Sequence, residues 1–149
     1  SHQGVKEAMK VSSLVKKIAD QVETVTALAD SAYLYNPNLD LSALTRPFAV
    51  VRSTINSEAV ISFSDATRKH DYQIWVYVYP ISNEYSALDL PKDVAAALKS
   101  ELTVTEGTGE TAKKYYAKIL DLTIERLNGD EDDLERFGSV VSFVIRFYK

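Results

Sequence analysis

Few residues in this chain could take part in acid–base chemistry. His70 is followed directly by Asp71, and a carboxylate beside a histidine could orient a general base. However, the chain has no Gly-x-Ser-x-Gly nucleophile motif, no phosphate-binding Gly-x-x-x-x-Gly-Lys-Ser/Thr loop and no His-Glu-x-x-His metal motif. We therefore interpret His70 as a histidine at the start of a strand, and we expect no catalytic residue, no bound cofactor and no enzymatic activity.

A dense acidic run is the second chemical feature. It consists of Asp130, Glu131, Asp132 and Asp133, with Glu135 following and Asn128-Gly129 preceding. Clustered carboxylates can bind calcium, but the ligand spacing of an EF-hand loop is missing. We expect no metal site here and interpret the run as a negatively charged surface that takes part in contacts between subunits.

Basic and aromatic residues could together form a nucleic-acid surface. Tyr33 and Tyr35 could stack on bases beside the cations Arg46, Arg52 and Arg68-Lys69. The net charge of −4 argues against a nucleic-acid partner, and the nine tyrosines also suit protein interfaces. We expect protein partners and no sequence-specific binding of nucleic acid.

The chain is 149 residues long, which corresponds to one domain spanning residues 1–149, and we interpret residues 1–4 as a probable tag remnant. It contains no cysteine, so neither a disulfide framework nor a thiol nucleophile is available. No apolar run has the length of a membrane span, and the first helix lacks the aromatic residues of a membrane-surface helix. We expect a soluble protein without a membrane partner.

The element most clearly defined by its pattern is the strand Lys69–Ile81, which is apolar or aromatic on both faces. We expect it at the centre of the sheet with Trp75 buried, so that Trp75→Ala would cost about 3–5 kcal/mol. The period of apolar residues predicts an α+β fold in the order α-β-β-β-α-α-β, with an antiparallel sheet of about four strands and three helices packed on it. The predicted elements are a helix over Val5–Ala29, strands over Pro47–Ile55, Glu58–Ser64 and Tyr72–Ile81, helices from Asp89 to Leu102 and from Glu110 to Leu127, and a strand over Ser139–Tyr148.

Two chemically different surfaces are left over once this core is assembled. The segment Ser31–Arg46 is too apolar for a solvated linker, and the predicted helix Glu110–Leu127 is apolar on more than one side. Unlike surfaces that meet each other form a head-to-tail contact. We therefore predict interface residues in both, namely Tyr33, Leu34, Tyr35, Leu39 and Leu41 in the first and Tyr115 and Tyr116 in the second, together with the acidic run.

The order of these elements resembles the tail-terminator proteins of long-tailed bacteriophages. The resemblance spans residues 5–149. It lies in the pattern of side chains along the strand segments PFAVVRS, ATRKHDYQIWVYVYP and SVVSFVIRFY rather than in a diagnostic motif. It implies a virion protein of the tail or neck, made in the host cytoplasm, that forms a hexameric ring, ends the tail tube and joins it to the head connector. The alternative is a small acidic adaptor or immunity-type protein that binds and inhibits one protein partner.

Overall fold

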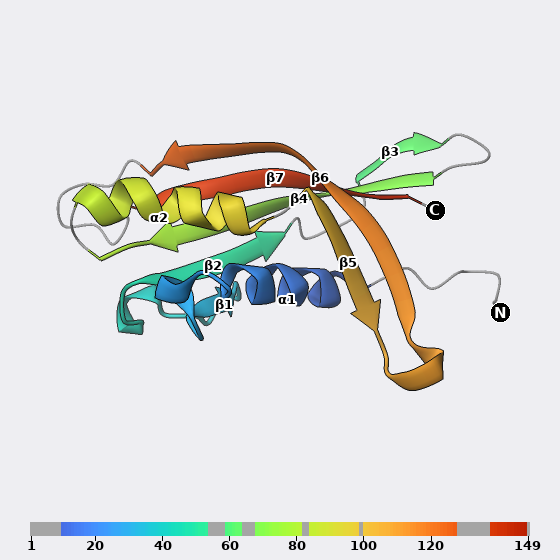
Figure 1. Cartoon of the computed structure of the whole chain (residues 1–149), viewed down its shortest axis with the longest axis horizontal. Coiled ribbons are helices and arrows are strands. Elements are labelled where there is room, and N and C mark those ends of the chain that lie inside the picture. The colour runs from blue at the N-terminus through green and yellow to red at the C-terminus, as the bar shows by residue number, and fades with distance from the viewer. Residues whose placement is uncertain are drawn as a thin grey trace.

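The computed structural model describes residues 10–53, 59–63, 68–81, 84–98, 100–127 and 138–148, with only the backbone described at 59–63, 68–70, 84–87 and 148. Two α-helices and seven strands lie in these ranges, joined by short 3-10 turns (Figure 1). They are α1 (Val11–Val22), β1 (Ala32–Leu34), β2 (Phe48–Ser53), β3 (Ala59–Phe63), β4 (Arg68–Tyr79), α2 (Glu84–Ala97), β5 (Glu101–Glu106), β6 (Lys113–Arg126) and β7 (Ser139–Tyr148).

All seven strands belong to one sheet in the order β1-β2-β4-β7-β6-β5, and β3 pairs with the first part of β4. β1 runs parallel to β2, and every other pair is antiparallel. The predicted fold class is therefore wrong: the sheet is mixed and has seven strands rather than about four, and the described residues contain two α-helices rather than three.

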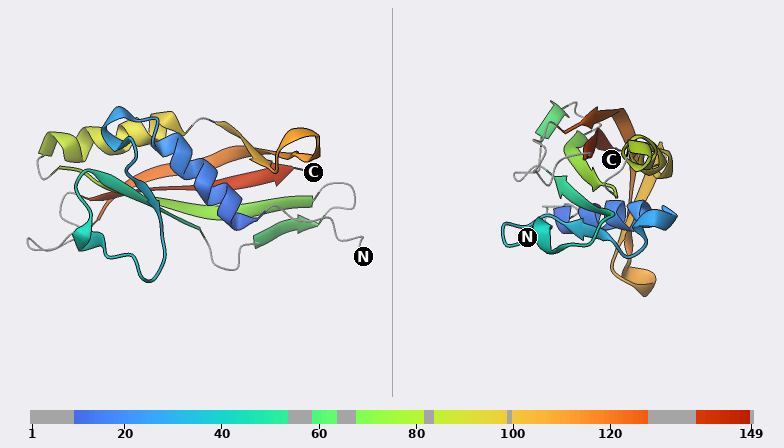
Figure 2. Two further views of the ribbon diagram at one scale, coloured as in Figure 1. Left: turned by 90° about the horizontal axis from the view of Figure 1, so that it is seen from below. Right: turned by 90° about the vertical axis from the view of Figure 1, so that its left-hand side faces the viewer.

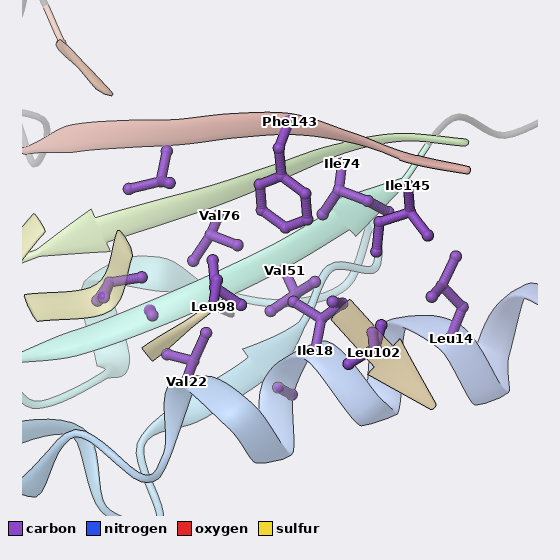
Figure 3. Packing of buried hydrophobic residues seen from close by; sticks show 14 of the residues in the cluster. Leu14, Ile18, Val22, Val51, Ile74, Val76, Leu98, Leu102, Phe143 and Ile145 are labelled. Atoms are coloured by element: carbon purple, nitrogen blue, oxygen red, sulfur yellow. The ribbon is translucent and has the colours of Figure 1, made fainter. Parts of the chain in front are cut away.

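The main core lies between the sheet and the two helices. α1 crosses the strands obliquely (Figure 2), and its apolar stripe of Leu14, Ile18 and Val22 is fully buried. These residues face Val51, Ile74, Val76, Phe143 and Ile145 of the sheet, with Leu98 after α2 and Leu102 of β5 beside them (Figure 3). Burial of this stripe explains why α1 is stable although it begins without a side-chain cap.

The opposite face of the sheet carries a smaller core at one end of β2 and β4. Phe48, Val50 and Tyr79 are buried there, and the rings of Phe48 and Tyr79 stack with centroids 4.8 Å apart. The segment between β1 and β2 covers this end with Leu39, Leu41 and Leu44. The predicted apolar connection thus packs on its own domain at these residues.

The segment predicted as a helix over Glu110–Leu127 is the strand β6, which is the largest error of the sequence analysis. Between Leu120 and Thr123 its register against β7 shifts, because two residues of β6 stand opposite one of β7. Asp121 lies in this bulge with a φ of 55°. One extra residue exchanges the two faces of a strand, since side chains alternate with a period of two. Residues 115, 117, 119, 122 and 124 therefore share one face, and their spacing imitates a helix.

β5 and the first half of β6 form a two-stranded arm, defined here as residues 101–106 and 113–118, in which Ala117 and Lys118 also pair with β7. Figure 1 shows this arm leaving the body of the protein past the start of α1. Its inner face carries Leu102, Val104 and Ala117, which are buried against the main core. The backbone N–H of Lys10 also donates to Glu106 Oε2 at 2.9 Å, which fixes the arm to the start of α1.

Candidate functional site

The first candidate surface lies where the chain leaves β1 at one end of the sheet. Leu34 is 37% exposed and Tyr35 is 46% exposed. The N–H of Tyr35 donates to the carbonyl oxygen of Val51 at 2.9 Å, and the guanidinium carbon of Arg52 lies 4.4 Å from the centroid of the Tyr35 ring. This cation–π contact contributes about 0.5–1 kcal/mol at an exposed site. The tyrosine is therefore held in position while half of its surface remains open to a partner.

The other three predicted residues of that segment point elsewhere. Tyr33 packs against the smaller core with its ring edge-on to Phe48 at 6.3 Å, and Leu39 and Leu41 pack against the same core. Their apolar surface thus covers their own sheet, whereas Leu34 and Tyr35 remain as candidates for a contact with another chain.

The second candidate surface is the outer face of the arm. Tyr115 and Tyr116 are neighbours in a strand, so their side chains point to opposite faces. Tyr115 packs against the main core, while Tyr116 is 62% exposed, the most exposed of the large apolar residues in the described part of the chain. The remaining outward residues are polar and exposed: Glu101, Thr103, Thr105, Lys114 and Lys118.

The two surfaces belong to opposite ends of the strand order. β1 is the first strand of the sheet order and β5 is the last, so Tyr35 and Tyr116 lie toward opposite edges. The third predicted element, the acidic residues Asp130, Glu131, Asp132 and Asp133, lies outside the described residues. One hydrogen bond joins the described residues on the two sides of this run. In it, the N–H of Leu127 donates to the carbonyl oxygen of Gly138 at 2.9 Å.

A third surface, which the sequence analysis missed, lies on the sheet face away from the helices. Trp75 of β4 stands opposite Arg52 of β2 on one side and opposite Ser142 of β7 on the other. Ser142 in turn stands opposite Thr123 of β6. The hydroxyl groups of Ser142 and Thr123 are 2.9 Å apart. This row could not be read from the sequence because its members come from four strands that pair over long distances along the chain.

Asp71 does not act as an isolated carboxylate beside His70. Its Oδ1 accepts from Arg146 Nε at 2.8 Å, and its Oδ2 accepts from an Arg146 terminal nitrogen at 2.7 Å. The backbone of His70 lies in β4, and its side chain lies outside the described part. Both oxygens of the carboxylate that would orient a base are thus engaged by Arg146 in a structural ion pair.

Trp75 is half-buried and not buried as predicted. Its burial resembles that of Gln73 and Tyr77 on the same face, while Ile74, Val76 and Val78 on the other face are buried completely. We now expect Trp75→Ala to lower the free energy of unfolding by about 2 kcal/mol, roughly half the cost at a fully buried site. Chemical denaturation followed by circular dichroism measures it, with Trp75→Phe as the control. A loss of 4 kcal/mol or more would contradict the half-buried position.

Two searches of the described residues gave negative results. No group of three or more His, Cys, Asp and Glu side chains there could hold a metal ion. Within the same ranges, no helix has the length and apolar character needed to cross a membrane.

Comparison with known proteins adds no assignment. The sequence matches no protein-family model, and no curated protein matches it.

Proposed function

We propose that this chain is a non-enzymatic structural protein that assembles head to tail into a ring of identical copies. The observation that carries the proposal is the placement of two unlike exposed surfaces, Leu34 with Tyr35 and the outer arm with Tyr116, toward opposite edges of one sheet. When one surface of a copy binds the other surface of the next copy, the resulting pair still has one unused surface of each kind, one at each end. Such contacts continue until the ring closes or a filament grows.

The narrower proposal is a tail terminator of a phage or phage-like particle, located in the tail or neck. It rests on the resemblance of PFAVVRS, ATRKHDYQIWVYVYP and SVVSFVIRFY to that family. These segments contain β2, β4 and β7, which are neighbours in the sheet. In this role the ring would contact the tail-tube protein on one side and the head connector on the other. The ring proposal does not depend on this narrower one.

A mixing experiment tests the ring. We expect Tyr35→Asp and Tyr116→Asp each to weaken self-association about 30-fold, which corresponds to roughly 2 kcal/mol at an interface hot spot. Native mass spectrometry over a range of concentrations should show monomers of each variant alone. An equal mixture should form dimers, because each variant retains the surface that the other has lost. Leu88→Asp, a substitution of a 51% exposed residue on α2, is the matched control and should still form rings.

The outcomes separate the two function classes. A wild-type chain that stays monomeric at high concentration and raised salt would reject the ring and favour the adaptor. Dimers that form in the wild type but are not recovered by the mixture would indicate that like surfaces meet, which also rejects the head-to-tail ring.

A further inference from the structure

The sheet ends in one strand edge at each end of its strand order. Among the described residues, β1 pairs with β2 on one side only, and β5 pairs with β6 on one side only. Such an edge presents backbone N–H and C=O groups, which are templates for a further strand. Proline, lysine or a β-bulge would hinder pairing at β5, but its segment Glu101–Glu106 contains none of these. The β5 edge therefore suits a strand of another chain.

Alternate residues of β5 turn their backbone groups toward this edge. The N–H of Ile119 donates to the carbonyl oxygen of Ser100 at 2.9 Å, and these two residues extend the register of β5 and β6 by one step. Hydrogen-bonded pairs alternate with non-hydrogen-bonded pairs in an antiparallel ladder. The residues whose N–H and C=O groups point away from β6 are therefore Glu101, Thr103 and Thr105, and their side chains are exposed on the outer face of the arm.

The same reasoning identifies the backbone groups at the β1 edge. Ser31 accepts a hydrogen bond from the backbone of β2 and Tyr35 donates one to it, each at 2.9 Å. Alternate residues of a strand bond to the same neighbour, so Ala32 and Leu34 turn their groups toward the edge. The N–H of Ala32 donates to Glu23 Oε2 at 3.3 Å. The carbonyl oxygen of Ala32 and both backbone groups of Leu34 are left for a further strand.

β1 and β5 run in the same direction. β1 is parallel to β2, and the four steps β2-β4, β4-β7, β7-β6 and β6-β5 are all antiparallel. After four reversals, β5 has the direction of β2 and hence of β1. Copies that are related by rotation about an axis along the strands keep these directions. In a ring of this kind, β5 of one copy meets β1 of the next as a parallel pair.

The backbone groups also fit a parallel pair in which both sheets face the same way. Leu34 stands opposite Val51 of the main core, so its side chain has the direction of the sheet face that carries the helices. In a parallel pair, a residue that bonds across the contact stands opposite one whose own groups point away, such as Leu102 on the same face. Tyr35 then stands opposite Thr103 on the outer face. An antiparallel pair would place Leu34 opposite an outward residue and turn one sheet over.

We propose that β1 of one copy and β5 of the next form a parallel pair with Tyr35 opposite Thr103, so that the sheets join edge to edge around the ring. This inference rests on the proposed ring and names the contact within it. Three backbone hydrogen bonds cross the contact. The N–H of Leu34 donates to the carbonyl oxygen of Glu101, the N–H of Thr103 donates to that of Leu34, and the N–H of Glu101 donates to that of Ala32.

Two observations favour this register over its neighbour. A register two residues further along β5 would require the N–H of Ala32 to donate across the contact, although Glu23 already accepts from it. In addition, Thr103 stands opposite Tyr116 within its own arm. The proposed register therefore places the exposed tyrosines Tyr35 and Tyr116 on the two sides of one threonine, where both rings are covered by the contact.

Disulfide trapping tests the contact directly, because the chain has no cysteine of its own. Neighbouring strands lie about 4.8 Å apart, within the Cα separation that a disulfide allows. An equal mixture of Tyr35→Cys and Thr103→Cys, oxidised at high protein concentration, should give a covalent dimer on a non-reducing gel. Tyr35→Cys mixed with Thr105→Cys is the matched control. It should give at least about fivefold less dimer, since residue 105 lies two positions further along the strand.

Proline substitution tests the backbone hydrogen bonds. Thr103→Pro removes an N–H that bonds across the contact but not within the arm, and proline is tolerated at such edge positions. Sedimentation velocity should show association about tenfold weaker, the effect of one lost hydrogen bond. Thr105→Pro is the control and should associate like the wild type, because residue 105 lies beyond the end of β1. Circular dichroism checks that both variants remain folded, and the trapping experiment decides if Thr103→Pro unfolds the arm.

Three results would overturn the strand pairing and leave the ring proposal standing: no mixed dimer, equal trapping at residues 103 and 105, or a folded Thr103→Pro variant that associates like the wild type. Two results would overturn both proposals. One is Thr103→Cys that cross-links alone as readily as in the mixture, because two β5 edges would then meet each other. The other is a wild-type chain that never associates.

Discussion

Replacing Arg146 by methionine is expected to lower the free energy of unfolding by about 3–5 kcal/mol, the usual cost of leaving a buried charge without its partner. The side chain of Asp71 is only 3% exposed, while that of Arg146 is 26% exposed. Without the guanidinium, the carboxylate would lose the two hydrogen bonds of 2.8 and 2.7 Å that compensate its burial. Equilibrium denaturation in urea measures the loss.

The asymmetry of exposure supplies the control. Asp71→Leu removes the more deeply buried charge and leaves Arg146 close to solvent, so it should cost less than Arg146→Met. The double variant should be more stable than Arg146→Met alone, because an apolar pair of similar volume often replaces a buried ion pair at little cost. Equal losses in the two single variants, or a double variant whose loss is their sum, would contradict this account.

Phe143→Ala is expected to cost about 3–5 kcal/mol by opening a cavity in the main core. Phe143 is 1% exposed and lies in the middle of the cluster between the sheet and α1 (Figure 3). For a chain of this length, each kcal/mol lowers the melting temperature by about 2–4 °C, so a drop of roughly 10 °C is expected in calorimetry.

Phe143→Leu is the matched control and should cost clearly less, since most of the volume is retained. A drop of only 2–3 °C for the alanine variant would mean that the neighbouring side chains collapse into the cavity, contrary to a closely packed core.

Alternation along single strands was sufficient to predict the centre of the sheet. In β4, the residues Ile74, Val76 and Val78 alternate with the bulkier Trp75 and Tyr77, and the structure places them on opposite faces. β7 was predicted for the same reason. Each of these strands is one continuous segment in which apolar residues recur with a regular period, and such a period can be recognised from the sequence alone.

The arm could not be predicted because the bulge at Asp121 breaks the period of β6. Tyr115, Ile119 and Leu122 are spaced by four and three residues, as on one side of a helix, and yet all three pack against the main core from a strand. Only pairing with β5 and β7 distinguishes a strand from a helix here, and the spacing of apolar residues in β6 taken alone does not show this pairing.

The candidate surfaces were predicted in part. The excess of apolar residues in Ser31–Arg46 was noticed, but the sequence does not tell which of them cover the chain's own sheet. Leu39 and Leu41 do so, while Tyr35 is turned toward Arg52. The Asp71–Arg146 pair joins residues 75 positions apart, a distance at which charge spacing along the chain carries no information.

The bulge in β6 also has an evolutionary consequence. Side chains of a regular strand change face at every residue, so a residue gained or lost in β6 exchanges the faces of the arm unless a bulge takes up the change. Loss of Asp121 alone would make the pairing of β6 with β7 regular, because Leu122 alone would then stand between Leu120 and Thr123. Tyr115 would stay on the inner face of the arm and Tyr116 on the outer face. Descendants of this chain should therefore tolerate loss of one residue at the bulge, whereas loss of one residue elsewhere in β6 would exchange the faces of the strand on one side of the change.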